Sequence, residues 1–243
     1  MKQCLVLSDN PAICKRIFLI NNKLGISNHF DFGTSIFSDI AQFSFINNEI
    51  KVYNLKDEDS LCQIINNYKI VISIHYKQLF PVNLLKNVRC YNLHPGYNPI
   101  NRGWYPQVFA IIKDTEIGAT FHEIDSEIDN GDIIYREIVP KFPWDTSFDL
   151  YNRVVDKEVE IYERFIECVI SNEYTKIKPE SGGVLHLKKD FNELLQIDLN
   201  KNGTYKEFID LLRALTFDKY DNAYFIDDSG NKIFISINLK KSD

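Results

Sequence analysis

An asparagine and a histidine, two residues apart, stand at the end of a short predicted strand (residues 90–93) in this 243-residue chain. Alternate side chains of a strand share a face, so Asn92 and His94 are predicted to point the same way. Pro95 and Gly96 follow and predict a sharp turn, which leaves that face open at a sheet edge. A carboxamide can donate to a developing negative charge, and an imidazole can move a proton near neutral pH. An ordinary structural hydrogen bond remains the alternative.

A second polar cluster occupies residues 125–132, with four acids in eight residues. Such a stretch is typical of a solvated loop or a loose cation site. Ile128 and Gly131 flank Asp129, however, in a pattern that favours a tight, partly buried turn before a strand. From the residues alone, both interpretations remain open.

Several common catalytic motifs are absent from the sequence. No GxGxxG or Walker sequence occurs among the ten glycines, which argues against nicotinamide-dinucleotide binding and ATP hydrolysis. The five histidines form no HxxxH or HExxH pattern, so we predict no metal. A GxSxG motif for a serine hydrolase is also missing.

The elements that position the polar residues alternate between strand and helix. Asn10 and Pro11 predict the start of a helix that stops at Gly25. Strands are predicted at 4–7, 51–55, 70–74 and 90–93, with a helix at 57–67. This alternation predicts an α/β fold with a mostly parallel central sheet. In such folds ligands bind beyond the strand ends, where the polar residues lie.

The remaining sequence predicts an addition to that sheet and a small C-terminal segment. Strands at 119–124 and 133–139 flank the acidic stretch, and the longest helix (146–171) is capped by Thr146. Residues 179–183 read as a linker, so we predict a catalytic domain at 1–180 and a C-terminal segment at 181–243. That segment is predicted to hold a helix at 205–215 and a β-hairpin from 222–226 and 232–239.

Composition limits the class of protein. A net charge of −6 argues against a nucleic-acid-binding surface. Five cysteines without a CxxC pair indicate reduced thiols in a cytosolic protein. The apolar runs are too short for a membrane span, and the N-terminus lacks a secretory pattern.

Two motifs resemble those of the formyltransferases that use N10-formyltetrahydrofolate: residues 91–96, YNLHPG, and residues 128–133, IDNGDI. The resemblance covers most of residues 1–240 and implies a Rossmann-like domain. It also implies that Asn92, His94 and Asp129 form the catalytic set. Residues 73–81 resemble the loop whose backbone holds the pterin, although relatives often carry glycine in its turn. The expected folate-binding residues are His75, Tyr76, Lys77, Leu79, His122 and Asp125.

Residues 98–107, NPINRGWYPQ, are similar to the signature of sugar N-formyltransferases that act on dTDP-linked amino sugars. This resemblance implies formylation of a dTDP-4-amino-4,6-dideoxy sugar, of glucose configuration, for O-antigen or lipopolysaccharide synthesis. It also implies a homodimer built with the C-terminal hairpin. The expected substrate-binding residues are Asp9, Lys77, Arg102, Trp104, Tyr105, Arg213 and Tyr224. Guanidinium groups suit the diphosphate and aromatic rings suit the base, with core packing the alternative for each ring.

The reaction would pass through a tetrahedral oxyanion. Asn92 suits the oxyanion donor, His94 the proton acceptor, and Asp129 the group that orients and stabilises the imidazole. A formyltetrahydrofolate hydrolase and a non-catalytic sugar-nucleotide-binding protein on the same fold remain alternatives. The position of the amine, C3 or C4, and the sugar configuration stay open. We expect no nucleic-acid or membrane partner.

Overall fold

The computed structural model describes residues 3–46 and 50–242 of the chain. It contains two compact units, each made from three stretches of sequence. The first unit holds the residues up to His94, Thr120–Arg136 and Glu158–Pro179. The second holds Pro95–Ala119, Glu137–Lys157 and the residues from Glu180 onward. The domain boundary at residue 180 stays a prediction.

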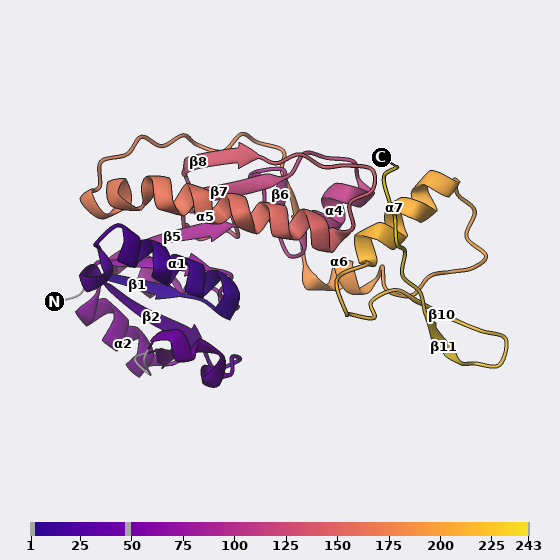
Figure 1. Ribbon diagram of the computed structural model, residues 1–243. Coiled ribbons are helices and arrows are strands. Elements are labelled where there is room, and N and C mark those ends of the chain that lie inside the picture. Colours follow the sequence, from indigo (N-terminus) through magenta and orange to yellow (C-terminus); the bar gives the residue numbers. More distant parts are fainter. Residues whose placement is uncertain (1–2, 47–49, 243) are drawn as a thin grey trace. The chain divides into compact units, whose positions relative to one another are not determined.

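A mostly parallel sheet organises the first unit (Figure 1). Its strands are β1 (Cys4–Leu7), β2 (Phe30–Ser35), β3 (Lys51–Tyr53), β4 (Ile70–Ile74), β5 (Arg89–His94), β7 (Gly118–Glu123) and β8 (Ile133–Ile138), in the order β3-β2-β1-β4-β5-β7-β8. β1 pairs in parallel with β2 and β4, β2 with β3, and β4 with β5. β7 runs antiparallel to β5. The predicted α/β class and mostly parallel sheet are confirmed.

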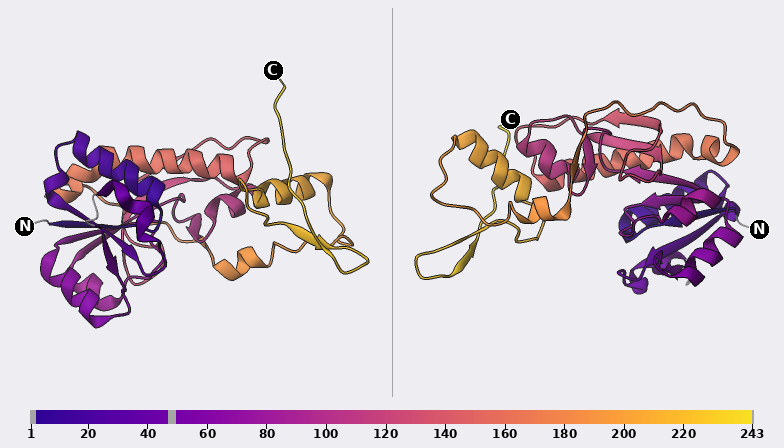
Figure 2. Two further views of the ribbon diagram at one scale, coloured as in Figure 1. Left: turned by 60° about the horizontal axis from the view of Figure 1, so that its bottom comes forward. Right: turned by 180° about the vertical axis from the view of Figure 1, so that it is seen from behind.

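Helices cover both faces of this sheet. They are α1 (Pro11–Lys23), α2 (Glu58–Asn67), α3 (Val82–Asn87) and α5 (Ser147–Ser171), with short 3-10 turns η1 (Ser27–His29) and η2 (Ile40–Ile46). α1 and α2 lie on opposite faces of the strands (Figure 2). One core cluster joins Leu5, Leu7 and Val71 of the strands to Leu61 and Ile64 of α2. On the other face, the Tyr162 hydroxyl of α5 donates to Asn21 Oδ1 of α1 at 2.9 Å.

Local signals set the helix ends as predicted. Asn10 Oδ1 accepts from the backbone amides of Ala12 at 3.1 Å and Ile13 at 3.3 Å, and Gly25 follows the helix with a φ of 72°. At the start of α5, Thr146 Oγ1 accepts from Asp149 N, while the Asp149 carboxylate accepts from Thr146 N.

The second unit contains short strands and helices. These are β6 (Asn101–Gly103), α4 (Pro106–Ile112), β9 (Val184–His186), α6 (Lys188–Asn192), α7 (Tyr205–Leu215), β10 (Tyr224–Ile226) and β11 (Lys232–Phe234). β6 and β9 pair in parallel, and α4 packs against α7. β10 and β11 form the predicted antiparallel hairpin. The C-terminal helix and hairpin are therefore confirmed.

Four strands are shorter than predicted, with β8 ending one residue early and β10 beginning two residues late. β3 stops at Tyr53 because the Leu55 amide donates to the Gln78 side chain at 2.7 Å instead of to a strand. β11 stops at Phe234 because the Ile237 amide donates to Thr216 Oγ1 beyond α7. Within the described residues, no helix is long and apolar enough to cross a membrane.

Candidate active site

Asn92 and His94 both face one carboxylate, that of Asp129. Asn92 Nδ2 donates to Asp129 Oδ1 at 3.0 Å, and His94 Nδ1 lies 3.5 Å from Asp129 Oδ2. The shared face predicted from the strand period is therefore confirmed. The side chain of His94 is 5% exposed and that of Asp129 11%. This shielding from water strengthens the electrostatic interaction between the two side chains.

The loop that carries Asp129 folds tightly against β7. Asp129 has a φ of 48°, in the left-handed region. A Cβ added to Gly131 would lie 1.9 Å from the carbonyl oxygen of Glu123, so only glycine fits there. The Glu123 amide also donates to the Asp132 carbonyl at 2.9 Å. The tight turn predicted around Asp129 is confirmed, while residues 125–127 are exposed.

A second layer of polar side chains secures both ends of this loop. Lys176 Nζ donates to Glu123 Oε2 at 2.6 Å and pairs with Asp132 Oδ2 at 3.1 Å. The hydrogen bonds to these two carboxylates raise the pKa of Lys176 above its usual range. Tyr174 donates to Glu123 Oε1 at 2.8 Å and meets the Tyr91 hydroxyl at 2.9 Å. The sequence reasoning did not single out these residues, whose contacts hold the loop in place.

His122 lies against the same three side chains. β5 and β7 pair so that Asn92 is directly opposite His122. The His122 Nδ1 is 2.6 Å from the Glu123 carbonyl oxygen, which can only accept, so Nδ1 carries the hydrogen. In the neutral ring Nε2 is then an acceptor, 3.4 Å from Asn92 Nδ2 and 3.6 Å from Asp129 Oδ1. His122 was predicted to bind folate; its ring is buried and contacts the Asn92–Asp129 pair.

The residues predicted for the folate loop differ in exposure. His75 is mostly buried and its Nε2 lies 2.8 Å from Glu158 Oε2. Tyr76 is half-buried, and its hydroxyl donates to the Tyr53 carbonyl at 2.9 Å. Lys77 and Leu79 are exposed. The side chains of His75 and Tyr76 are therefore held by protein groups, whereas those of Lys77 and Leu79 are exposed.

Asp9, predicted to bind the sugar nucleotide, is surrounded by donors from the protein itself. Its Oδ1 accepts from Thr34 Oγ1, Ser38 Oγ, and both the amide and hydroxyl of Ser35, at 2.6–3.0 Å. Its Oδ2 accepts from the Lys77 amide at 2.7 Å. Burial alone would raise the pKa of Asp9, but the bonds from Ser38, Ser35 and Lys77 hold that pKa below its usual value. Asp9 thus joins the ends of β1 and β2 to the turn at residues 75–77.

Asp125, the remaining predicted folate residue, is exposed, and its Oδ1 accepts from the Glu127 amide at 2.8 Å. Of the other predicted sugar-nucleotide residues, Lys77 is exposed in the first unit, and the remaining five lie in the second unit. Arg102 is half-buried on β6, and Trp104 is 39% exposed. The Tyr105 ring stacks on Phe191, with 4.0 Å between the centroids.

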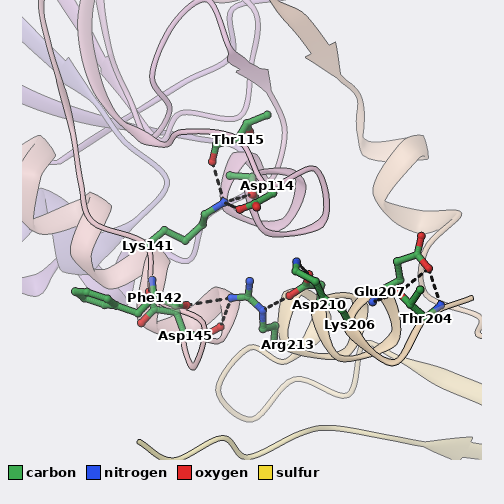
Figure 3. Close-up of polar contacts among 11 residues, drawn as sticks. Asp114, Thr115, Lys141, Phe142, Asp145, Thr204, Lys206, Glu207, Asp210 and Arg213 are labelled. Atoms are coloured by element: carbon green, nitrogen blue, oxygen red, sulfur yellow. Dashed lines mark hydrogen bonds and ion pairs between the residues drawn. The ribbon is translucent and has the colours of Figure 1, made fainter.

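Arg213 of α7 is almost fully buried, and protein oxygens surround its guanidinium (Figure 3). Its Nε donates to Asp210 Oδ1 at 2.7 Å, and its Nη1 donates to the carbonyls of Phe142 at 3.2 Å and Asp145 at 3.0 Å. Tyr224 on β10 is half-buried, with Lys232 Nζ 3.7 Å from the centre of its ring. The hydrogen bonds from Arg213 to Asp210, Phe142 and Asp145 favour a structural role for its side chain.

The family models match both parts of the sequence. Residues 19–166 match the model described as formyl transferase, and residues 190–241 match the N-formyltransferase dimerization C-terminal domain. The chain belongs to the formyltransferase family. Among the residues that the structure describes, no group of three or more His, Cys, Asp or Glu side chains forms a metal site in this formyltransferase.

Relatives of this formyltransferase include sugar-modifying enzymes. A dTDP-4-amino-4,6-dideoxyglucose formyltransferase from Mycobacterium tuberculosis is 43% identical over 182 residues, which are 75% of this chain and 78% of that protein. The structure of a 4-N formyltransferase from Francisella tularensis is 41% identical, with a TM-score of 0.91 over 99% of each chain. A sugar N-formyltransferase from a Shewanella species is 35% identical, with a TM-score of 0.91 over both whole chains.

One residue of this formyltransferase was missed although its position gave a signal. Glu158 is fully buried in α5, where it follows Val154 by four residues and precedes Tyr162 by four. That spacing puts a carboxylate on the apolar face of the helix. An acid at a core position is rarely buried without a partner, and here its partner is His75.

Proposed function

We propose that this protein transfers the formyl group of N10-formyltetrahydrofolate to the 4-amine of a dTDP-4-amino-4,6-dideoxy sugar, of glucose configuration. The observation that carries the proposal is the Asp129 carboxylate shared by Asn92 and His94. The substrate assignment is supported by the 43% identity to an enzyme named for dTDP-4-amino-4,6-dideoxyglucose.

The geometry supports separate roles for Asn92 and His94 during formyl transfer. The sugar amine attacks the formyl carbon, and the carbonyl oxygen becomes an oxyanion. Asn92 donates one N–H to Asp129 and has a second for the oxyanion, which without substrate is directed at His122 3.4 Å away. His122 thereby sets the plane of the carboxamide.

The amine must lose a proton as the new C–N bond forms. His94 accepts it, and the resulting imidazolium is stabilised by Asp129, 3.5 Å from Nδ1. The bond between the formyl carbon and N10 then breaks, and the proton passes to N10. The products are the formamido sugar nucleotide and tetrahydrofolate. The folate is a co-substrate, and this scheme uses no metal.

We also propose a homodimer in the cytoplasm, acting in O-antigen or lipopolysaccharide synthesis. Residues 190–241 match a dimerization domain, and this region exposes apolar side chains such as Ile226, Ile233 and Phe234. The five cysteines are unpaired, as is usual in a reducing compartment.

The test uses purified protein, N10-formyltetrahydrofolate and a panel of dTDP-amino sugars that differ in amine position and in configuration. Mass spectrometry should detect one added formyl group on the 4-amino glucose-configured sugar at the highest kcat/KM. Preference for a 3-amino sugar would correct the substrate. Release of formate without any formylated sugar would indicate a hydrolase, and nucleotide binding without turnover would indicate a non-catalytic protein.

A further inference from the structure

Glu158 is an acid in the apolar core of the first unit. Its side chain is 0% exposed, and its Oε2 lies 2.8 Å from His75 Nε2. Its other oxygen, Oε1, has no hydrogen-bond partner among the described residues. A buried carboxylate needs strong compensation to remain in the fold, and His75 is its partner in the structure. The pair therefore joins α5 to the end of β4.

His75 adopts a backbone conformation that its side chain disfavours. Its φ is 54°, in the left-handed region, which glycine enters readily and residues with a Cβ do not. The residue follows β4 directly and precedes the exposed residues Lys77 and Leu79. Something outside the turn must hold His75 in this conformation, and the bond to Glu158 is placed to do so.

The turn is also held from its other side by Asp9. The Asp9 amide donates to the His75 carbonyl at 3.3 Å, and the Asp9 carboxylate accepts from the Lys77 amide at 2.7 Å. Those bonds fix the backbone of residues 75–77. These two backbone bonds do not involve the imidazole of His75, which is bonded to Glu158 of α5. Two acids from different elements thus determine the path of one short turn.

We propose that Glu158 is a positioning residue for the folate co-substrate. Through His75 it stabilises the left-handed turn within the loop, residues 73–81, that would hold the pterin. The inference rests on the proposed function for the assignment of this loop to folate. It adds Glu158, a residue from outside that loop, and it explains how a histidine occupies a turn that glycine would adopt without help.

The experiment compares variants by calorimetric binding of 5-formyltetrahydrofolate, a stable folate, and by steady-state kinetics with each substrate varied. Glu158→Leu and Glu158→Ala both remove the acceptor but differ in size, so an effect common to both does not come from packing. Glu158→Gln keeps an oxygen that can accept from His75. Glu163→Leu is the matched control, because Glu163 lies on the same helix and pairs with Lys23 at the surface.

Both Glu158→Leu and Glu158→Ala should weaken folate binding about tenfold and raise the folate KM similarly, while the sugar-nucleotide KM stays unchanged. Glu158→Gln and Glu163→Leu should bind folate within about threefold of the wild type. The decisive variant is His75→Gly/Glu158→Leu, since glycine adopts the turn without the pair. It should restore folate affinity to within about threefold of the wild type.

If the pair had only a structural role, Glu158→Leu and Glu158→Ala would lower thermal stability and leave the folate KM of the folded protein unchanged. That result would overturn the inference. So would a double variant that binds folate no better than Glu158→Leu. Should Glu158→Leu fail to fold, Glu158→Ala and His75→Gly/Glu158→Ala give the same comparison. A wild-type protein that binds folate without formylating a sugar would refute the proposed function but leave this test intact. A wild type without folate affinity would refute both.

Discussion

Replacing Asp129 with asparagine isolates the charge of the group that joins Asn92 and His94. The substitution keeps the size of the side chain, and the amide oxygen can still accept from Asn92 Nδ2. It removes the negative charge 3.5 Å from His94 Nδ1. The chemistry proposed above requires that charge when His94 takes the proton of the amine. We therefore expect the loss to fall on turnover and not on substrate binding.

The magnitude follows from the distance and the burial. Two unit charges 3.5 Å apart interact by about 5 kcal/mol at an effective dielectric constant of about 20. Both side chains are nearly buried, so solvent screens this interaction only weakly. Because about 1.4 kcal/mol corresponds to a factor of ten, Asp129→Asn should lower kcat roughly a thousandfold. Both KM values should stay within about threefold.

The assay is steady-state release of tetrahydrofolate at saturating concentrations of both substrates. Circular dichroism and thermal melting would check that the variant is folded. Glu127→Gln is the control, because it neutralises an exposed acid in the same loop; its kcat should match the wild type. A folded Asp129→Asn enzyme with kcat within tenfold of the wild type would refute the role of the carboxylate.

Further predictions concern the second unit. Arg102→Ala should raise the KM for the sugar nucleotide about tenfold and leave the folate KM unchanged, because a phosphate contact stabilises the ground state and the transition state equally. Trp104→Ala should act in the same direction. An equal rise in both KM values would contradict the assignment of these residues to the sugar nucleotide. Ile233→Glu should yield a monomer by light scattering at micromolar concentration, since a charge would be buried at the proposed interface; a persisting dimer would place the interface elsewhere. Arg213→Ala should lower the free energy of unfolding, measured in urea, by about 3 kcal/mol, because Asp210 would remain buried with a weaker set of partners. An unchanged stability with a raised sugar-nucleotide KM would instead support Arg213 as a substrate-binding residue.

Local rules were sufficient for the parts of the fold governed by neighbouring residues. The period of a strand placed Asn92 and His94 on one face, and the caps at Asn10 and Thr146 set two helix starts. Asp129 is different, because it lies 37 residues from Asn92 in the chain. No local spacing brings those two together, and the prediction depended on resemblance to a family.

Elements with weak local patterns were missed. β2 ends in Gly33, Thr34 and Ser35, and the buried hydroxyls of Thr34 and Ser35 donate to Asp9, so this end of the strand has no apolar pattern. β6 and β9 have three residues each, and their paired residues are 83 positions apart in the sequence, so periodicity gives no sign of the pairing. α4 is buried on nearly all sides, so its sequence shows no alternation between an apolar and a polar face that would predict a helix. Its starting proline was the available signal.

The hydrogen bonds from Arg213 to the segment before α5 affect when the second unit can fold during translation. The guanidinium bonds the carbonyl of Asp145, which leaves the ribosome 68 residues earlier. Until α7 emerges, the carbonyls of Phe142 and Asp145 lack the guanidinium as a donor, and the middle stretches of the second unit lack the surface on which they pack. A nascent chain can therefore complete the sheet of its first unit long before its second. Translation that stops short of residue 213 would release a half-assembled protein, a substrate for chaperones and proteases.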